Sequence, residues 1–161
     1  KQLNLSIPEH DSEIYSLLGS GSVGNSIRLL EHDGASLYRT LLSFLNQLPN
    51  LNNFELEKFI TTFLGNKNKS RLELFVELLN MAIARISKAG IMGNKYSHQL
   101  LKDEIEVFEK LCPTPNIARK WAELAQKQSE KLKNGLAVNL DPASLILDTF
   151  FQIEDCARAV R

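Results

Sequence analysis

The sequence is poor in several features that mark whole classes of protein. Its 161 residues include two cysteines and one tryptophan, and its 19 basic residues balance its 19 acidic residues. Cys112 and Cys156 are too few for a disulfide framework and lack the spacing of a zinc site, so we expect a reducing, cytoplasmic compartment. The neutral total charge gives no overall field that attracts a phosphate backbone or an anionic membrane surface.

Long apolar runs and known catalytic motifs are also missing. No apolar run approaches the roughly 20 residues that a membrane helix needs, and no phosphate-binding loop, Gly-x-Ser-x-Gly elbow or His-Glu-x-x-His motif occurs. None of His10, His32 and His98 has a second ligand at metal-binding spacing. We therefore expect no catalytic residue, no cofactor and no metal. Because residue 1 is Lys1 rather than methionine, we expect a piece of a longer protein.

Helical periodicity dominates what is present. Apolar residues recur at spacings of three and four, and no stretch alternates as a half-buried strand does, which predicts an all-α helical bundle. The strongest periodicity lies between Ser70 and Gly90, and we expect this helix at the centre of the core. Capping and breaking residues predict helix starts at Ser6, Ser22, Asn52, Ser70, Thr114 and Asp141, and helix ends at Gly19, His32, Pro49, Gly65, Gly90, Cys112 and Gly135.

The last helix is apolar on more than one side. Its expected buried stripe is Leu145, Ile146, Phe150 and Ile153. Leu147 and Phe151 widen this apolar surface, so we expect the helix to be buried on two sides, either by another subunit or within a tightly packed monomer. Leu147 and Phe151 are the candidate interface residues. Trp121, on the preceding helix, is predicted to be a core anchor.

The charged clusters favour a solvated surface over a reactive site. Asp103, Glu104, Glu106 and Glu109 are expected on an exposed, ion-paired helix face with Lys102 and Lys110 nearby, rather than as an acid and base pair. The basic stretches at residues 67–71 and 127–133 lack interleaved aromatic residues that would stack on bases. We expect no direct binding of nucleic acid.

One segment resembles a known family. Residues 19–30 read Gly-Ser-Gly-Ser-Val-Gly-Asn-Ser-Ile-Arg-Leu-Leu, a glycine-rich turn that leads into an apolar helix. The segment resembles the last lid helix of AAA+ clamp-loader subunits, where Gly-Ser-Met-Arg-Asp-Ala-Leu is a usual pattern. In family members that use ATP, an arginine two positions after the serine faces the phosphates. Here that position is Gly24, a degenerate sensor, and Arg28 lies one helical turn further on, so the role does not transfer to it.

The C-terminal half adds a second match. Residues 117–124, Ile-Ala-Arg-Lys-Trp-Ala-Glu-Leu, and 139–150, Asn-Leu-Asp-Pro-Ala-Ser-Leu-Ile-Leu-Asp-Thr-Phe, resemble the end of the delta prime family of bacterial DNA polymerase III subunits. Residues 54–86 are similar to the middle of that family's chains. The resemblance implies a partial lid at residues 1–33 and a helical collar domain at 34–161. The family's arginine finger lies in an N-terminal part without a counterpart here, so no catalytic residue is implied.

For function, the resemblance implies a part of the replication machinery that performs no chemistry of its own. The collar would hold the loader's subunits together, with gamma or tau and delta as partners, and would reach the sliding clamp and primed DNA only through the whole complex. It would neither bind nor hydrolyse ATP. Two other functions stay open. A ligand-binding or dimerisation domain of a transcription regulator requires a pocket of drug-like volume between helices, and an enzyme requires a cluster of buried, strongly shifted carboxylates or histidines in a cleft.

Overall fold

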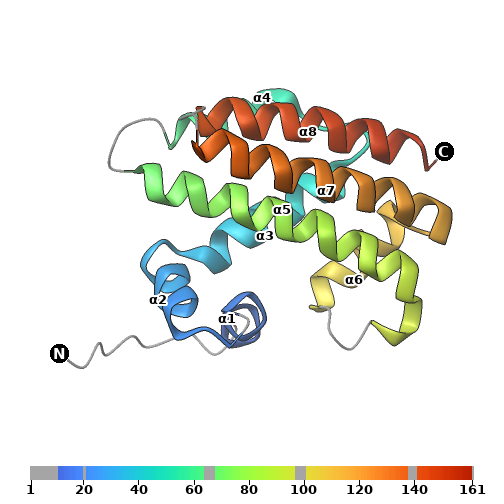
Figure 1. Cartoon of the computed structure of the whole chain (residues 1–161), viewed down its shortest axis with the longest axis horizontal. Coiled ribbons are helices and arrows are strands. Elements are labelled where there is room, and N and C mark those ends of the chain that lie inside the picture. Colours follow the sequence, from blue (N-terminus) through green and yellow to red (C-terminus); the bar gives the residue numbers. More distant parts are fainter. Residues whose placement is uncertain (1–10, 20, 64–67, 97–100, 138–140, 161) are drawn as a thin grey trace.

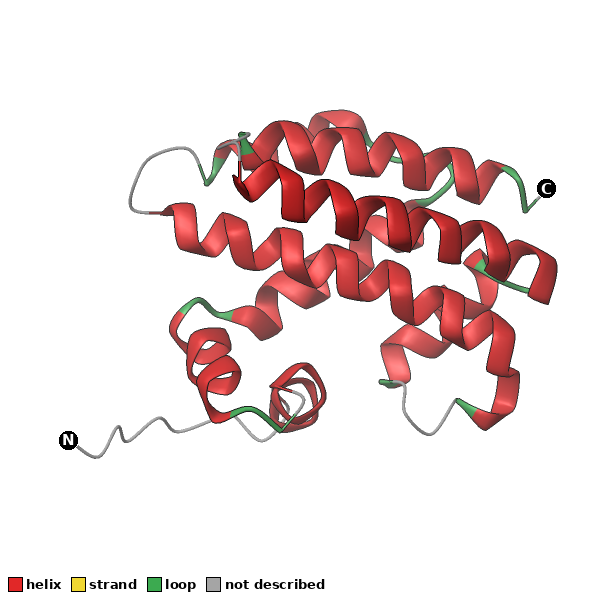
Figure 2. Ribbon diagram, in the orientation of Figure 1, coloured by secondary structure: helices red, strands yellow, loops and turns green. Residues whose placement is uncertain are grey.

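The computed structural model describes residues 11–19, 21–63, 68–96, 101–137 and 141–160. Within these residues every regular element is helical, so the predicted all-α class is confirmed (Figure 2). None of the described helices is both long and apolar enough to cross a membrane. The elements are α1 (Ser12–Gly19), α2 (Val23–Glu31), α3 (Gly34–Gln47), α4 (Asn53–Thr61), α5 (Lys69–Met92), the 3-10 turn η3 (Gly93–Lys95), α6 (Lys102–Leu111), α7 (Pro115–Ala137) and α8 (Pro142–Arg158).

Three long helices form the body of the molecule. In Figure 1, α5, α7 and α8 lie roughly parallel along the long axis, and α3 passes behind α5. The short helices α1 and α2 lie below one end of this layer, and α6 lies below the other end (Figure 1). Helix α5 packs against α3, α6, α7 and α8. The prediction that this helix occupies the centre of the core is therefore confirmed.

Most of the helix starts predicted from capping residues are correct. Side-chain oxygens accept hydrogen bonds from the first-turn amides at Ser22 (3.4 Å), Asn52 (3.3 Å), Thr114 (3.4 Å) and Asp141 (3.0 Å). These bonds satisfy amides that have no partner inside the helix. The start predicted at Ser6 lies outside the described residues.

Two boundaries of α5 differ from the prediction. Ser70 lies inside the first turn, because the helix begins at Lys69 and is preceded by Asn68. Gly90 does not end the helix, which continues to Met92 and stops at Gly93, where the backbone takes a φ of 53°. A left-handed conformation of this kind favours glycine, so the glycine that ends the helix is Gly93 and not Gly90.

Helix ends elsewhere agree less closely with the prediction. Helix α1 ends at Gly19 and α6 is capped by Cys112, as predicted. Helix α4 ends at Thr61, before Gly65, which lies outside the described residues. Helix α7 runs through Gly135 to Ala137.

Gly90 lies at a close contact between α5 and α7. A Cβ atom added there would be 2.2 Å from Cys112 Sγ and 2.9 Å from Ala118 Cβ. One turn earlier, Ser87 Oγ donates a hydrogen bond of 3.1 Å to the Ala118 carbonyl. Trp121 is fully buried and its Nε1 donates to the Leu111 carbonyl at 3.0 Å, which confirms its predicted role as a core anchor. Small residues thus let the two helices approach, and Trp121 fills the space beside them.

The core runs without interruption from the N-terminal helices into the long ones. Buried apolar residues of α1 and α2, such as Tyr15 and Leu29, belong to the same cluster as those of α3, α5, α7 and α8. Phe44 of α3 makes edge-to-face contacts with Phe59 of α4 and Phe150 of α8, at centroid distances of 5.4 and 5.9 Å. The domain boundary expected after residue 33 stays a prediction.

The contact at Gly90 predicts a large difference between two helical glycines. Gly90→Ala should destabilise the fold by about 1–3 kcal/mol, because the new methyl group overpacks the α5–α7 interface. Gly24→Ala is the matched control, since the nearest atom to its added Cβ is Ser22 Oγ at 4.0 Å. There the gain in helix propensity should stabilise the protein by up to about 1 kcal/mol. Urea unfolding followed by circular dichroism measures both changes, and equal midpoints for the two variants would contradict the assigned contact.

Candidate functional site

The glycine-rich turn leads into α2, and the serine side chains at the start of this helix hydrogen-bond to its own backbone. Ser22 Oγ caps α2, and Ser26 Oγ donates a 3.0 Å hydrogen bond to the Ser22 carbonyl. Gly24 is exposed in the first turn of α2. Arg28 Nη2 forms an ion pair of 2.8 Å with Glu77 Oε1 of α5, so its guanidinium binds the helical body. The Arg28–Glu77 ion pair therefore links α2 to α5.

A small groove lies beside this ion pair. It has a volume of about 190 Å³ and is lined on one side by Leu18 and Leu29, and on the other by Leu78 and Met81 of α5. A ligand-binding domain of a transcription regulator would need a pocket of about 300–1,000 Å³ that encloses its ligand. This groove is smaller than that range.

A buried carboxylate corrects one of the predictions. Asp103, Glu106 and Glu109 are exposed, as expected, but the Glu104 side chain is fully buried. Lys110 donates to the carbonyl of Asn46 instead of pairing with an acidic residue. Helical periodicity alone placed Glu104 at the edge of the charged face, and its partners lie 19 and 66 residues away in the sequence.

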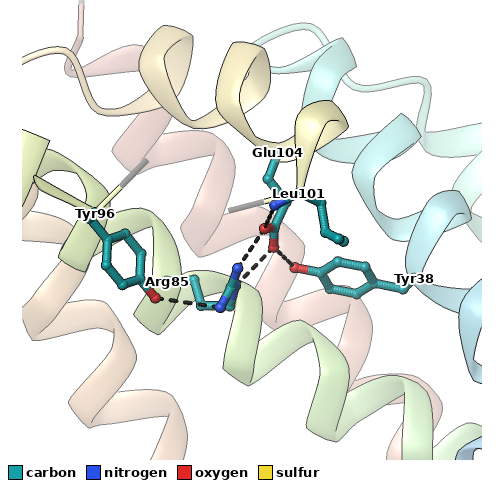
Figure 3. Close-up of polar contacts among 5 residues, drawn as sticks. All are labelled: Tyr38, Arg85, Tyr96, Leu101 and Glu104. Carbon is teal, nitrogen blue, oxygen red and sulfur yellow. Dashed lines mark hydrogen bonds and ion pairs between the residues drawn. The ribbon is translucent and has the colours of Figure 1, made fainter. Parts of the chain in front are cut away.

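Glu104 accepts hydrogen bonds from two neighbouring helices and from the residue that precedes its own helix (Figure 3). Arg85 of α5 donates from Nε to Oε1 at 2.8 Å and from Nη2 to Oε2 at 2.5 Å. Tyr38 of α3 donates its hydroxyl to Oε1, and the amide of Leu101 donates to Oε2 at 2.8 Å. Arg85 also donates to the hydroxyl of Tyr96 at 3.4 Å. We call these five residues, Tyr38, Arg85, Tyr96, Leu101 and Glu104, the Glu104 cluster.

The surroundings of the Glu104 cluster raise the pKa of two of its donors, Tyr38 and Arg85. Burial raises the pKa of Tyr38 well above its usual value, and the negative charge of Glu104 raises it further, so the tyrosine stays a neutral donor. The pKa of Arg85 is raised because its hydrogen bonds and attraction to Glu104 outweigh the effect of burial. The carboxylate is thus held by a bidentate arginine, which is the strong form of such a pair. Both of its oxygens already accept hydrogen bonds, an arrangement that suits a structural role connecting α3, α5 and α6.

The histidines and cysteines of the described residues lie apart from the Glu104 cluster. His32 is the C-cap of α2, as its predicted helix-ending role requires, while His10 and His98 lie outside the described residues. Burial raises the pKa of the Cys112 thiol to about 11 and also raises that of the half-buried Cys156. In the part of the chain that the structure describes, no three or more His, Cys, Asp or Glu side chains are grouped so that they could hold a metal ion.

The basic stretches are partly engaged in local contacts. Lys69 lies 4.0 Å from Glu73, and the Arg71 guanidinium lies 5.7 Å from the Phe63 ring centroid. Lys131 of α7 forms an ion pair with Asp148 of α8. Lys67 and the Lys133 side chain lie outside the described residues.

The two candidate interface residues of α8 have different surroundings. Leu147 is half-buried and packs against the core, whereas Phe151 exposes 56% of its surface. Leu145, Ile146, Phe150 and Ile153 are buried as predicted. Of the two apolar residues beyond the core stripe, Phe151 is the one whose ring is mainly in contact with solvent.

A larger groove runs between α7 and α8. Its volume of about 450 Å³ lies within the range of ligand pockets, but it opens to solvent and does not enclose a ligand. Its lining includes Leu124 and Lys127 of α7 and Asp155 and Cys156 of α8. No periodicity could have predicted it, because each helix supplies only one wall.

Comparisons of the chain with protein-family models, with curated proteins and with solved structures found no match.

The Glu104 cluster predicts a strong effect of removing its charge. Glu104→Gln should destabilise the protein by about 3–5 kcal/mol, because it leaves the Arg85 charge buried without its counter-ion. Glu106→Gln, an exposed substitution on the same helix, should change stability by less than about 0.5 kcal/mol. Denaturant unfolding of both variants checks this prediction, and a loss below 1 kcal/mol at Glu104 would show that the ion pair is solvated.

The raised pKa of Tyr38 predicts a loss of stability at alkaline pH. A tyrosine in the unfolded chain ionises near pH 10, while Tyr38 in the fold stays protonated to higher pH. The contribution is therefore complete below about pH 10 and is lost above it, at about 1.4 kcal/mol per pH unit. Tyr38→Phe should lower stability at neutral pH but remove this share of the alkaline slope. Unfolding curves measured between pH 8 and about 11.5 test it, and parallel pH profiles for the two proteins would refute it.

Proposed function

We propose that the chain is a non-catalytic assembly module of a bacterial DNA polymerase III clamp loader, corresponding to the C-terminal region of the delta prime subunit. Residues 1–33 would be the remaining part of an AAA+ lid, and residues 34–161 the collar domain. The resemblance of residues 19–30, 117–124 and 139–150 to that family supports this assignment. The work of such a module is to hold the ATPase subunits at fixed positions, so that they can load the sliding clamp on primed DNA in the bacterial cytoplasm.

The observation that carries the proposal is the exposed ring of Phe151. Helix α8 already buries a full apolar stripe in the core, yet Phe151 stands on its outer side with 56% of its surface exposed. Exposed aromatic residues are enriched where proteins meet, and rings of this size often dominate the binding free energy. A contact with a neighbouring gamma, tau or delta subunit would remove this ring from water.

The start of α2 supports the absence of nucleotide chemistry. Gly24 occupies the position of the sensor arginine, and the nearby Arg28 is paired with Glu77. Ser22 and Ser26 already use the polar groups at this helix start. An assembly role needs none of these groups to face a phosphate.

A rigid interior suits an assembly role. The α5–α7 contact at Gly90 leaves no space for a methyl group, and the Glu104 cluster fixes α3 and α6 to α5. A closely packed interior transmits forces with little deformation. A collar of this kind would keep the positions of its neighbours during their ATP-driven movements.

The proposal predicts that one exposed phenylalanine matters for assembly and another does not. Phe151→Ser should weaken binding to a purified mixture of gamma or tau with delta by tenfold or more, because an interface aromatic residue is lost. Phe54→Ser is the matched control, since Phe54 of α4 exposes 75% of its surface. Its affinity should stay within threefold of the parent chain.

Sedimentation velocity with fluorescently labelled chain gives the affinities, and circular dichroism verifies that both variants are folded. If the parent chain fails to bind folded partners, the assignment to the clamp loader is wrong. If both variants bind as the parent does, α8 is not the contact surface.

A further inference from the structure

The groove between α7 and α8 has an apolar floor and a charged rim. Leu124 is buried and Cys156 is half-buried, so they form its base. Lys120, Glu123 and Lys127 are exposed along the α7 edge, and Asp155 is exposed on the α8 edge. A trough of about 450 Å³ with this lining can receive a row of apolar side chains between two rows of polar ones.

A polar network that includes the lining residue Gln152 connects α7 and α8 beside the groove. Lys131 of α7 forms an ion pair with Asp148 of α8, and Gln152 Nε2 donates to the same carboxylate at 2.6 Å. Deeper between the helices, the hydroxyl of Thr149 donates to Gln128 Oε1 at 3.0 Å. These contacts hold α7 and α8 at a fixed separation, so the groove is formed before any partner arrives. Binding to a preformed groove avoids part of the ordering cost.

The charges on the α7 edge are available to a partner. Lys120, Glu123 and Lys127 follow one another at spacings of three and four residues, which places them along one face of the helix. Within the described residues, none of the three forms an ion pair with an N···O distance of 4.0 Å or less. Lys131, further along α7, is paired with Asp148. The edge therefore presents a positive, a negative and a positive charge, each separated by about one helical turn.

Phe151 lies next to this groove. It precedes Asp155 by four residues on α8, so the two side chains are neighbours on the helix surface. The exposed ring therefore lies beside the α8 edge of the groove, although Phe151 is not one of its lining residues. We call the groove together with this ring the α7–α8 surface; its members are Lys120, Glu123, Leu124, Lys127, Phe151, Asp155 and Cys156.

We propose that the α7–α8 surface receives an amphipathic helix from a neighbouring clamp-loader subunit, an inference that rests on the function proposed above. The trough between two packed helices has the shape into which the side-chain ridge of a third helix fits. The apolar ridge of the incoming helix covers Leu124, Cys156 and Phe151. Its flank beside α7 carries an acidic, a basic and an acidic residue at one-turn spacing, which complements Lys120, Glu123 and Lys127.

The two cysteines provide a test that needs no engineered probe. Cys156 lines the groove and is half-buried, whereas Cys112 is buried beneath Gly90. N-ethylmaleimide at pH 8 is therefore expected to label Cys156 faster than Cys112, as read by mass spectrometry of peptides. Saturating amounts of gamma or tau with delta should slow the labelling of Cys156 at least tenfold. The slower labelling of Cys112 serves as the internal control for unfolding.

A charge reversal tests the pattern on the α7 edge. Lys127→Glu should weaken binding to the same partners tenfold or more, because it places a negative charge opposite the acidic flank of the incoming helix. Arg119→Glu is the matched control: Arg119 is exposed on the same helix, undergoes the same change of charge and does not line the groove. Its affinity should remain within threefold of the parent chain.

The outcomes separate this inference from the function on which it rests. If the partners bind while Cys156 reacts at its original rate and Lys127→Glu binds like the parent, the groove is not the contact and the clamp-loader assignment stands. If the parent chain does not bind the partners, both fail. If Cys156 becomes protected as the isolated chain is concentrated, and sedimentation shows a dimer, a second copy occupies the groove and the assignment to a neighbouring subunit is overturned.

Discussion

The close approach of α5 and α7 is the constraint on which the rest of the fold depends. Gly90 and Ala118 leave so little space between the two helices that a single added methyl group would collide with Cys112 and Ala118. Cys112, the C-cap of α6, takes part in the same contact, so the end of α6 is packed against it. Helix α7 then supplies the surface against which α8 packs. One pair of small residues therefore positions the elements of the C-terminal half.

The Glu104 cluster adds a directional constraint to this apolar packing. Apolar contacts tolerate small rotations of a helix, but a carboxylate that accepts hydrogen bonds from Tyr38 and a bidentate Arg85 tolerates few. Replacement of a buried ion pair by apolar residues is often neutral for stability, so its main contribution here is geometric. It fixes the mutual orientation of α3, α5 and α6, which meet at one point of the interior (Figure 3).

The sequence predicted well whatever depends on neighbouring residues. Capping at Ser22, Asn52, Thr114 and Asp141 is decided by bonds that span three residues, and these starts are correct. The all-α class follows from a periodicity that extends along the chain. Two features that depend on distant residues were missed. In the sequence Glu104 belongs to a charged helix face, and only the fold brings Tyr38 and Arg85 beside it. Gly90 has the position of a helix end in the sequence, but in the fold Cys112 and Ala118 fill the space that a side chain at residue 90 would need.

The candidate surface on α8 shows the same limit. The surplus of apolar residues on the last helix was visible in the sequence, but the different fates of Leu147 and Phe151 depend on how α8 is rotated against the core. The adjoining groove could not be predicted, since Leu124 and Cys156 share a floor only after α7 and α8 pack together.

The charge pattern of the α7–α8 surface gives this packing a consequence for recognition. Exposed ion pairs contribute little affinity. Alternating charges do lower the affinity for partners whose charges have a different spacing, because like charges then lie opposite one another. The spacing between these charges is one turn of α7. The orientation of Lys120, Glu123 and Lys127 depends on how α7 lies against α5. The contact at Gly90 is therefore not separate from the surface: it sets the rotation of α7, and with it the direction in which those three charges point. Binding of a partner helix to this edge would therefore depend on how α7 is packed against the core.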